Sequence, residues 1–224
     1  MFEKILDANA VTLVGKIITE KEFSHEMYGE GFFTFELEVP RLSDYVDILP
    51  VTISERLFSN AELKVGDYVL VEGQLRSYNR YIKNSNRLVL TIFARDICIL
   101  KEEELMDALK KPNEIYIDGY ICKAPIYRTT PFGREITDLL VAVNRPYNKS
   151  DYIPCIAWGR NARFCNRLSI GDHVKLWGRV QSREYQKKLP NGEVLTRVAF
   201  EVSISKLEYI KNDNNRVGKE DMED

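Results

Sequence analysis

The sequence predicts an all-β chain that contains the same domain twice. Along residues 33–39 apolar side chains alternate with polar ones, which is the period of a half-buried strand. Further runs rich in β-branched and aromatic residues follow along the chain, whereas helical periodicity is confined to short stretches. The second half of the chain then repeats the landmarks of the first at a nearly constant offset. These observations together predict two similar β domains in tandem.

The repeat can be followed in register along both halves. Most landmarks lie 104 residues apart, and one inserted residue changes the offset to 105 in the later part. The paired landmarks are Gly15 and Gly119, Arg41 and Arg145, Asp47 and Asp151, segments 65–73 and 170–178, and Ser77 and Ser182. A repeat of about a hundred residues is far longer than a solenoid unit, so it indicates a duplicated domain.

Each copy shows three strand-like runs, one short helical pattern and two more strand-like runs. After a first strand around Gly15, the runs cover 33–39, 46–53, 68–75 and 88–99, and in the second copy 115–121, 136–143, 152–157, 173–180 and 198–207. The helical patterns cover 54–63 and 159–168. This order is that of a five-stranded OB barrel. Glycines are expected where barrel strands bend sharply, at Gly15, Gly73, Gly119 and Gly178.

These patterns predict four regions along the 224 residues. We expect a divergent OB-fold domain at 1–100, a linker or short charged helix at 101–112, a second OB-fold domain at 113–210, and a disordered acidic tail at 211–224.

Several classes of function are disfavoured. No run approaches the roughly 20 apolar residues that span a bilayer, and the start lacks the pattern of a signal peptide, so we expect a cytoplasmic protein. The four cysteines have no C-x-x-C spacing and are expected to be reduced, and the two histidines form no zinc pattern. No phosphate loop, dinucleotide fingerprint or nucleophile elbow occurs. We therefore predict no enzyme, with no catalytic residues, no metal and no cofactor.

The net charge of −2 hides an asymmetry between the two copies. Residues 1–111 carry a balance of −5, residues 112–210 one of +5, and residues 211–224 one of −2. A basic segment beside an acidic one suggests that the basic copy has a polyanionic partner.

The second copy combines aromatic and cationic side chains in the way that single-stranded nucleic acid requires. Such a ligand offers flat base faces beside a charged backbone, so its binder needs aromatic platforms next to Lys and Arg. The candidate platforms are Tyr147, Tyr152, Trp158 and Tyr185, among Arg145, Lys149, Arg160, Arg183, Lys187 and Lys188. Each aromatic has an alternative place in the core or on an ordinary surface. Trp177, in an alternating strand, is assigned to the barrel core.

Three blocks of the second copy, Leu140–Tyr147, Asp151–Gly159 and Ile170–Tyr185, occur in order with suitable gaps. This pattern resembles the bacterial single-stranded DNA-binding protein family across residues 113–210. The resemblance implies that the same four aromatics, Tyr147, Tyr152, Trp158 and Tyr185, stack on DNA bases. Because that family usually assembles four OB barrels, it also implies that this chain forms a homodimer.

The first copy resembles the family weakly. At the paired positions it has no aromatic residue, only Ser43, Ile48, Ser54 and Arg80. Possible secondary platforms are Tyr45, Tyr78 and Tyr81, and its hairpin carries Arg76, Arg80, Lys83, Arg87 and Arg95. This copy is either a weaker binding surface or chiefly an assembly surface. The acidic C-terminus lacks the apolar tip of the family, which leaves open whether it recruits repair or replication proteins.

The sequence therefore predicts a sequence-tolerant binder of single-stranded DNA that acts in replication, repair or recombination. Two alternatives remain: a protein-interaction module like the primosomal accessory proteins built on the same barrel, and a single-stranded RNA-binding OB protein. The four matched aromatics favour nucleic acid over a pure interaction module. A stacking platform accepts DNA and RNA alike, so the choice between them stays open.

Overall fold

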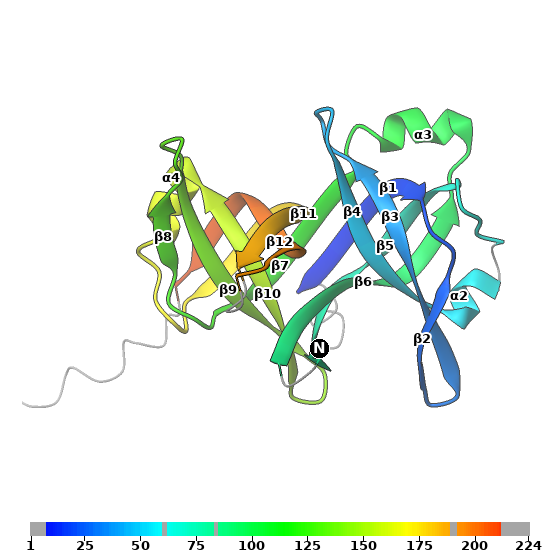
Figure 1. Ribbon diagram of the computed structural model, residues 1–224, viewed down its shortest axis with the longest axis horizontal. Coiled ribbons are helices and arrows are strands. Elements are labelled where there is room, and N and C mark those ends of the chain that lie inside the picture. Colours follow the sequence, from blue (N-terminus) through cyan, green and yellow to red (C-terminus); the bar gives the residue numbers. More distant parts are fainter. Residues whose placement is uncertain (1–7, 60–61, 83–84, 189–191, 212–224) are drawn as a thin grey trace, which may run out of the picture.

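The computed structural model describes residues 8–59, 62–82, 85–188 and 192–211, which form two β-barrels lying next to each other (Figure 1). The first half contains β1 (Asn9–Ile17), β2 (Glu22–Met27), β3 (Glu30–Pro40), β4 (Val46–Ser54), α2 (Glu55–Ser59), β5 (Tyr68–Ile82) and β6 (Ser85–Ile99). The second half contains β7 (Asn113–Ile121), β8 (Ile126–Thr129), β9 (Glu135–Arg145), β10 (Lys149–Trp158), α4 (Gly159–Cys165), β11 (His173–Lys188) and β12 (Val194–Ile210). The charged helix α3 (Glu102–Ala108) connects the two halves, where a linker or short helix is predicted.

Both halves close in the same way. In the first barrel the strands neighbour one another in the order β3, β4, β6, β5 and β1, and β3 also pairs with β1 to close the ring. The second barrel repeats this order with β9, β10, β12, β11 and β7, closed by the pairing of β7 with β9. In each barrel the third and fifth barrel strands pair in parallel, β4 with β6 and β10 with β12. The predicted class, two tandem OB barrels with one short helix each, is confirmed.

The first strands of the two barrels pair with each other. β1 and β7 run antiparallel, with Asn9 opposite Ile117 and Leu13 opposite Asn113. The two barrels therefore share one continuous twelve-stranded sheet among the described residues. Asn9 and Asn113 are equivalent in the repeat, so a rotation of about 180° around the middle of this pair relates one barrel to the other.

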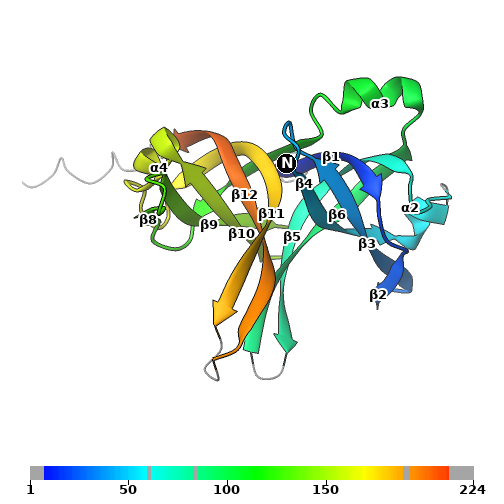
Figure 2. The ribbon, with the colours of Figure 1, turned by 45° about the horizontal axis from the view of Figure 1, so that its top comes forward.

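Two parts of the strand pattern go beyond what the sequence predicts. The arms β5–β6 and β11–β12 continue past the predicted runs 68–75 and 173–180, and both project from the same side of the molecule (Figure 2). The short strands β2 and β8 are also additional, and every residue of both is exposed. Apolar alternation marks only strands that cover a core, so exposed segments of this kind carry no such pattern.

Trp177 does not lie in the barrel core, so that prediction is wrong. The neighbouring side chains of Val174 and Leu176 are fully buried, and strand alternation places Trp177 on the outer face. There it packs against the ring of Tyr116, with centroids 5.2 Å apart, and the Nζ of Lys206 lies 4.3 Å from its centroid.

Two of the predicted bends are glycines for a steric reason. Gly73 and Gly178 lie at bulges where the pairing register shifts, and a Cβ there would lie 2.3 Å from the carbonyl O of Phe93 and 2.2 Å from that of Ser203.

We expect Gly178→Ala and Gly73→Ala each to lower the free energy of unfolding by about 1–3 kcal/mol, because the strands must move apart. Urea unfolding measures this, with the exposed Thr196→Ala as a control expected to change stability by less than about 0.5 kcal/mol. A Gly178→Ala protein as stable as the wild type would contradict the steric argument.

Candidate nucleic-acid interface

Strand β10 directs two of the predicted aromatics outward. Along this strand Asp151, Ile153 and Cys155 point into the barrel, so Tyr152 and Trp158 share the outer face. Trp158 lies six positions after Tyr152, which places the two residues about 20 Å apart along the strand. The structure therefore does not bring these two rings into contact with each other.

The other two predicted aromatics lie on connections. Tyr147 lies in the turn between β9 and β10, with a positive φ of 62° and a side chain that is almost fully exposed. Tyr185 lies on the projecting arm, opposite Arg197 of β12. The four aromatics are thus spread along one barrel from the turn to the arm, rather than gathered in one pocket.

Trp158 lies in an open groove with several arginines. We call this cavity of about 380 Å³ the second-barrel groove. Its lining residues are Arg41, Arg134, Trp158, Arg179, Gln181, Ser182 and Arg183. The Trp158 side chain is 39% exposed, so part of its ring remains free for a ligand.

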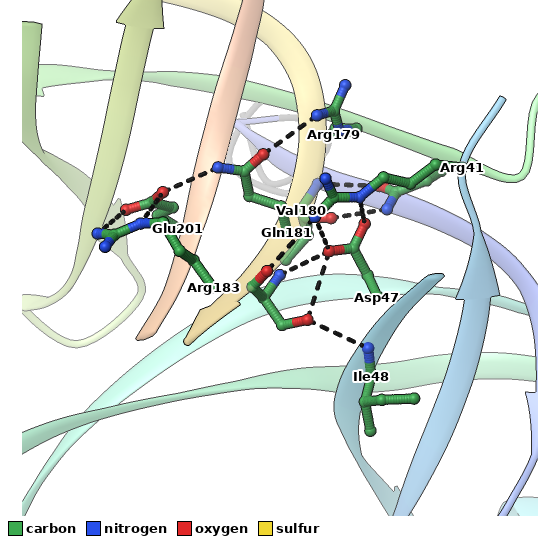
Figure 3. Close-up of polar contacts among 10 residues, drawn as sticks. Arg41, Asp47, Ile48, Arg179, Val180, Gln181, Arg183 and Glu201 are labelled. Carbon is green, nitrogen blue, oxygen red and sulfur yellow. Dashed lines mark hydrogen bonds and ion pairs between the residues drawn. The ribbon is translucent and has the colours of Figure 1, made fainter. Parts of the chain in front are cut away.

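The arginines of this groove differ in how far they are neutralised. Arg183 pairs with Glu201 at 3.2 Å, and this hydrogen bond raises the pKa of Arg183 (Figure 3). Burial lowers the pKa of Arg179, and the nearby positive charge of Arg41 lowers it further. In the described part of the chain, no carboxylate lies within ion-pair distance of Arg134 or Arg179. The groove therefore has cationic groups available for an anionic backbone.

A buried carboxylate from the first barrel binds the arm of the second. Asp47 on β4 is fully buried and accepts the backbone N–H of Ser182 at 2.8 Å (Figure 3). Ser182 Oγ in turn accepts the backbone N–H of Ile48 at 3.2 Å. Arg41 donates to Asp47 at 2.6 and 2.8 Å, which raises the pKa of Arg41 and holds its guanidinium at the second-barrel groove.

The second barrel repeats this arrangement on the first. Asp151 on β10 is fully buried and accepts the backbone N–H of Ser77 at 2.8 Å, and Ser77 Oγ accepts the N–H of Tyr152 at 2.7 Å. Arg145 and Arg76 both pair with Asp151, at 3.1 Å each. We call the two contacts, Asp47 with Ser182 and Asp151 with Ser77, the interbarrel clamp.

Apart from Arg183 in the second-barrel groove, the predicted cations are clamp residues, exposed residues or residues whose side chains are not described. Arg76 and Arg145 belong to the interbarrel clamp, whereas Arg80 and Arg87 lie exposed on the first arm, where Arg87 reaches the carbonyl O of Val198 at 3.4 Å. Lys149 and Arg160 lie exposed beside the turn and on α4. Lys187 and Lys188 lie in β11 and Tyr81 in β5, but only their backbones are described, and Lys83 lies outside the described residues.

The sequence reasoning missed three arginines of the groove: Arg41, Arg134 and Arg179. Arg41 comes from the first barrel, so only the docking of the two barrels brings it to Trp158. The one available signal was the repeated spacing of Arg41 and Asp47, which recurs as Arg145 and Asp151.

The described residues show neither a metal cluster nor a membrane-spanning helix. No group of three or more His, Cys, Asp or Glu side chains could hold a metal ion there, and no described helix is long and apolar enough to cross a bilayer. Cys155 and Cys165 are buried, and burial raises the pKa of Cys165 to about 12. Both therefore remain neutral thiols at physiological pH.

These features define a tandem OB-barrel protein whose second barrel carries an aromatic and cationic groove. The model of the single-strand binding protein family matches residues 112–210. The single-stranded DNA-binding protein of Clostridium tetani is 31% identical over 93 residues, which cover 38% of this chain and 64% of that protein. The second half of this chain, residues 112–210, therefore matches the single-strand binding protein family.

Solved structures are similar to the whole chain or to part of it. The wild-type single-stranded DNA binding protein from Thermus aquaticus has a TM-score of 0.73 at 19% identity, and the match covers 94% of this chain and 96% of that one, which shows a shared fold. The dimeric N-terminal domain of PriB protein from Thermoanaerobacter tencongensis is 61% identical over 42% of this chain and 98% of its own, with a TM-score of 0.38. Against the curated relatives it matches, this chain spans between 50% and 68% of their length.

Proposed function

We propose that this chain binds single-stranded DNA without reading its sequence and catalyses no reaction. The observation that supports this most directly is the second-barrel groove. Trp158, in the half that matches the family, lies there with three arginines of that half and with Arg41 of the first barrel. A partly exposed indole offers a base a stacking face, and the arginines provide charges for the phosphates. Tyr147, Tyr152 and Tyr185 extend the platform along the same barrel, together with the predicted cations around them.

Salt and strandedness test this proposal. Binding to oligo-dT is expected to weaken steeply as salt rises, because cationic side chains release counterions from the backbone. If the four arginines each contact one phosphate, the slope of log K against log salt is about −3. A duplex of equal length is expected to bind much more weakly, since paired bases do not offer their faces. Fluorescence anisotropy with oligo-dT, matched RNA and duplex measures both effects.

The three ligands of this titration distinguish the alternative functions. Equal affinity for duplex and single strand would contradict stacking as the source of binding. Tighter binding of the matched RNA than of oligo-dT would favour the RNA alternative, because the 2′-hydroxyl is the group that distinguishes the two ligands.

We also propose that the chain forms a homodimer with four OB barrels. One chain already joins two barrels through β1 and β7, and β2 and β8 remain as the edge strands of the described sheet. Edge strands present unpaired backbone groups that a second chain can bind across a two-fold axis. Light scattering at micromolar concentration should therefore give twice the 26.0 kDa of one chain. A mass near 26.0 kDa would contradict the dimer.

We also propose that the chain binds single-stranded DNA in the cytoplasm, during DNA replication, repair or recombination. We also propose domain boundaries at 1–100 and 113–210, and the shared sheet joins these two domains. The acidic tail from residue 212 onward lies outside the described residues, and its recruitment of partner proteins stays an open prediction.

A further inference from the structure

The first barrel has a groove of its own, with different aromatic residues. This cavity of about 880 Å³, the first-barrel groove, lies between β2 and the first arm. Phe23 is 62% exposed there and packs edge-on against Phe33, with centroids 5.7 Å apart. Arg76 lies 6.0 Å from the ring centroid of Phe93, and Tyr78 and Arg80 line the same cavity. Aromatic faces and cations therefore meet in the first barrel too, although its residues at the family positions are not aromatic.

The two grooves occupy equivalent places in the repeat. The positions that line both are Arg41 and Arg145, Arg76 and Gln181, Ser77 and Ser182, and Tyr78 and Arg183. Each groove also contains an arginine from the opposite barrel. Arg41 of the first barrel lines the second-barrel groove, and Arg145 of the second barrel lines the first-barrel groove. These two arginines and the clamp serines mark the inner end of each groove, next to the interbarrel clamp.

A two-fold rotation places equivalent ends of the two grooves next to each other. The antiparallel register of β1 with β7 and the duplicated clamp both follow this rotation. If a DNA strand binds one groove with its 5′ to 3′ direction pointing toward the clamp, the two-fold rotation predicts the same direction in the other groove. There too the DNA strand runs 5′ to 3′ toward the clamp. One unbroken strand that passes directly between the inner ends runs toward the clamp in one groove and away from it in the other. It therefore matches the preferred direction of only one groove.

We infer that the chain binds two single-stranded segments of opposite polarity at once, one in each groove. The ligand is either one strand folded back on itself or the two separated strands of an opened duplex. This inference rests on the proposed function, because it requires that the second-barrel groove holds single-stranded DNA. The clamp supports it structurally, since it fixes the two grooves relative to each other with buried carboxylates.

Oligonucleotides with an inverted linkage at their centre test this inference. Three oligo-dT series are compared by anisotropy: one with uniform polarity, one with a central 5′–5′ linkage and one with a central 3′–3′ linkage. Total lengths of about 8 to 32 nucleotides suffice, since one barrel of this kind covers about 4–16 nucleotides. One inverted series should reach tight binding at a shorter length than the uniform series. At that length its affinity should be about ten-fold higher, because the second segment then binds intramolecularly.

Variants assign the second segment to its groove. Phe23→Ala should remove the advantage of the favoured inverted series. Tyr209→Ala, a partly exposed residue near the end of β12 that lines neither groove, should leave it unchanged. Three series with the same length dependence, or an advantage that survives Phe23→Ala, would overturn the inference. Failure of the proposed function is distinguishable, because all three series would then bind weakly or bind without dependence on Trp158.

Discussion

Trp158→Ala is expected to weaken binding to oligo-dT about five- to a hundred-fold. Stacking of one base on an aromatic side chain contributes about 1–3 kcal/mol by alanine substitution, and about 1.4 kcal/mol corresponds to a factor of ten in affinity. The ring is 39% exposed at the end of β10, so its removal should leave no closed cavity and the variant should fold. Fluorescence anisotropy on the folded variant measures the loss. Trp158→Phe should keep part of the affinity, and Tyr185→Ala should lose somewhat less than Trp158→Ala.

The equivalent position of the first barrel provides a matched control. Ser54→Ala should change the affinity little, because Ser54 is nearly buried and hydrogen-bonds to Glu30. Its Oγ also accepts the N–H of Arg56 at the start of α2, so alanine is expected to cost about 1 kcal/mol of stability. The two copies are thus expected to contribute unequally, with the second dominant.

Tryptophan fluorescence separates Trp158 from the one other tryptophan, Trp177. DNA should quench Trp158 in its groove, whereas Trp177 should respond little because it lies against Tyr116 on the outer face. In Trp158→Phe the quenching should therefore largely disappear. If Trp158→Ala folds normally and binds like the wild type, the site is wrong, and the basic hairpin between Arg76 and Arg87 becomes the better candidate.

The repeat explains why the barrels could be predicted and the groove only in part. The nearly constant offset between the two copies was enough to predict the strand order, the bends at Gly73 and Gly178 and the equivalence of the copies. These features depend on the sequence of each copy alone. The aromatic and cationic pattern of the second copy and the family resemblance both select Trp158 and the three tyrosines. Arg41 reaches Trp158 only because one barrel docks on the other, and nothing in a single copy encodes that neighbour.

The strand pattern fails where side chains leave the core. Trp177 lies on the outer face although its neighbours in the alternating pattern are buried. The period of a strand separates its two faces but does not show which of them covers the core. The sequence did not indicate Phe23 as a binding residue, because β2 is exposed throughout and shows no alternation of apolar and polar residues. The clamp residues Asp47 and Asp151 appeared in the sequence only as repeat landmarks. In the structure each of these carboxylates accepts a backbone N–H from the other barrel and so joins the two barrels.

The interbarrel clamp leads to the second large expected effect. Asp151 is fully buried and holds the side chains of Arg76 and Arg145 and the backbone N–H of Ser77. Removing the carboxylate leaves these donors without their acceptor, and two partly buried positive charges then repel each other. Burial already lowers the pKa of Arg76, which indicates that this guanidinium is poorly hydrated and depends on Asp151.

Asp151→Ala is therefore expected to lower the free energy of unfolding by about 3–5 kcal/mol, as measured by urea unfolding. Asp138→Ala is the matched control, because Asp138 forms an exposed ion pair with Arg128 at 2.8 Å and should cost less than about 1 kcal/mol. Asp47→Ala should lie near Asp151→Ala, slightly lower because a single arginine pairs with Asp47. If Asp151→Ala instead unfolds within 1 kcal/mol of the wild type, water or a rearranged side chain replaces the carboxylate, and the clamp does not hold the two grooves in place.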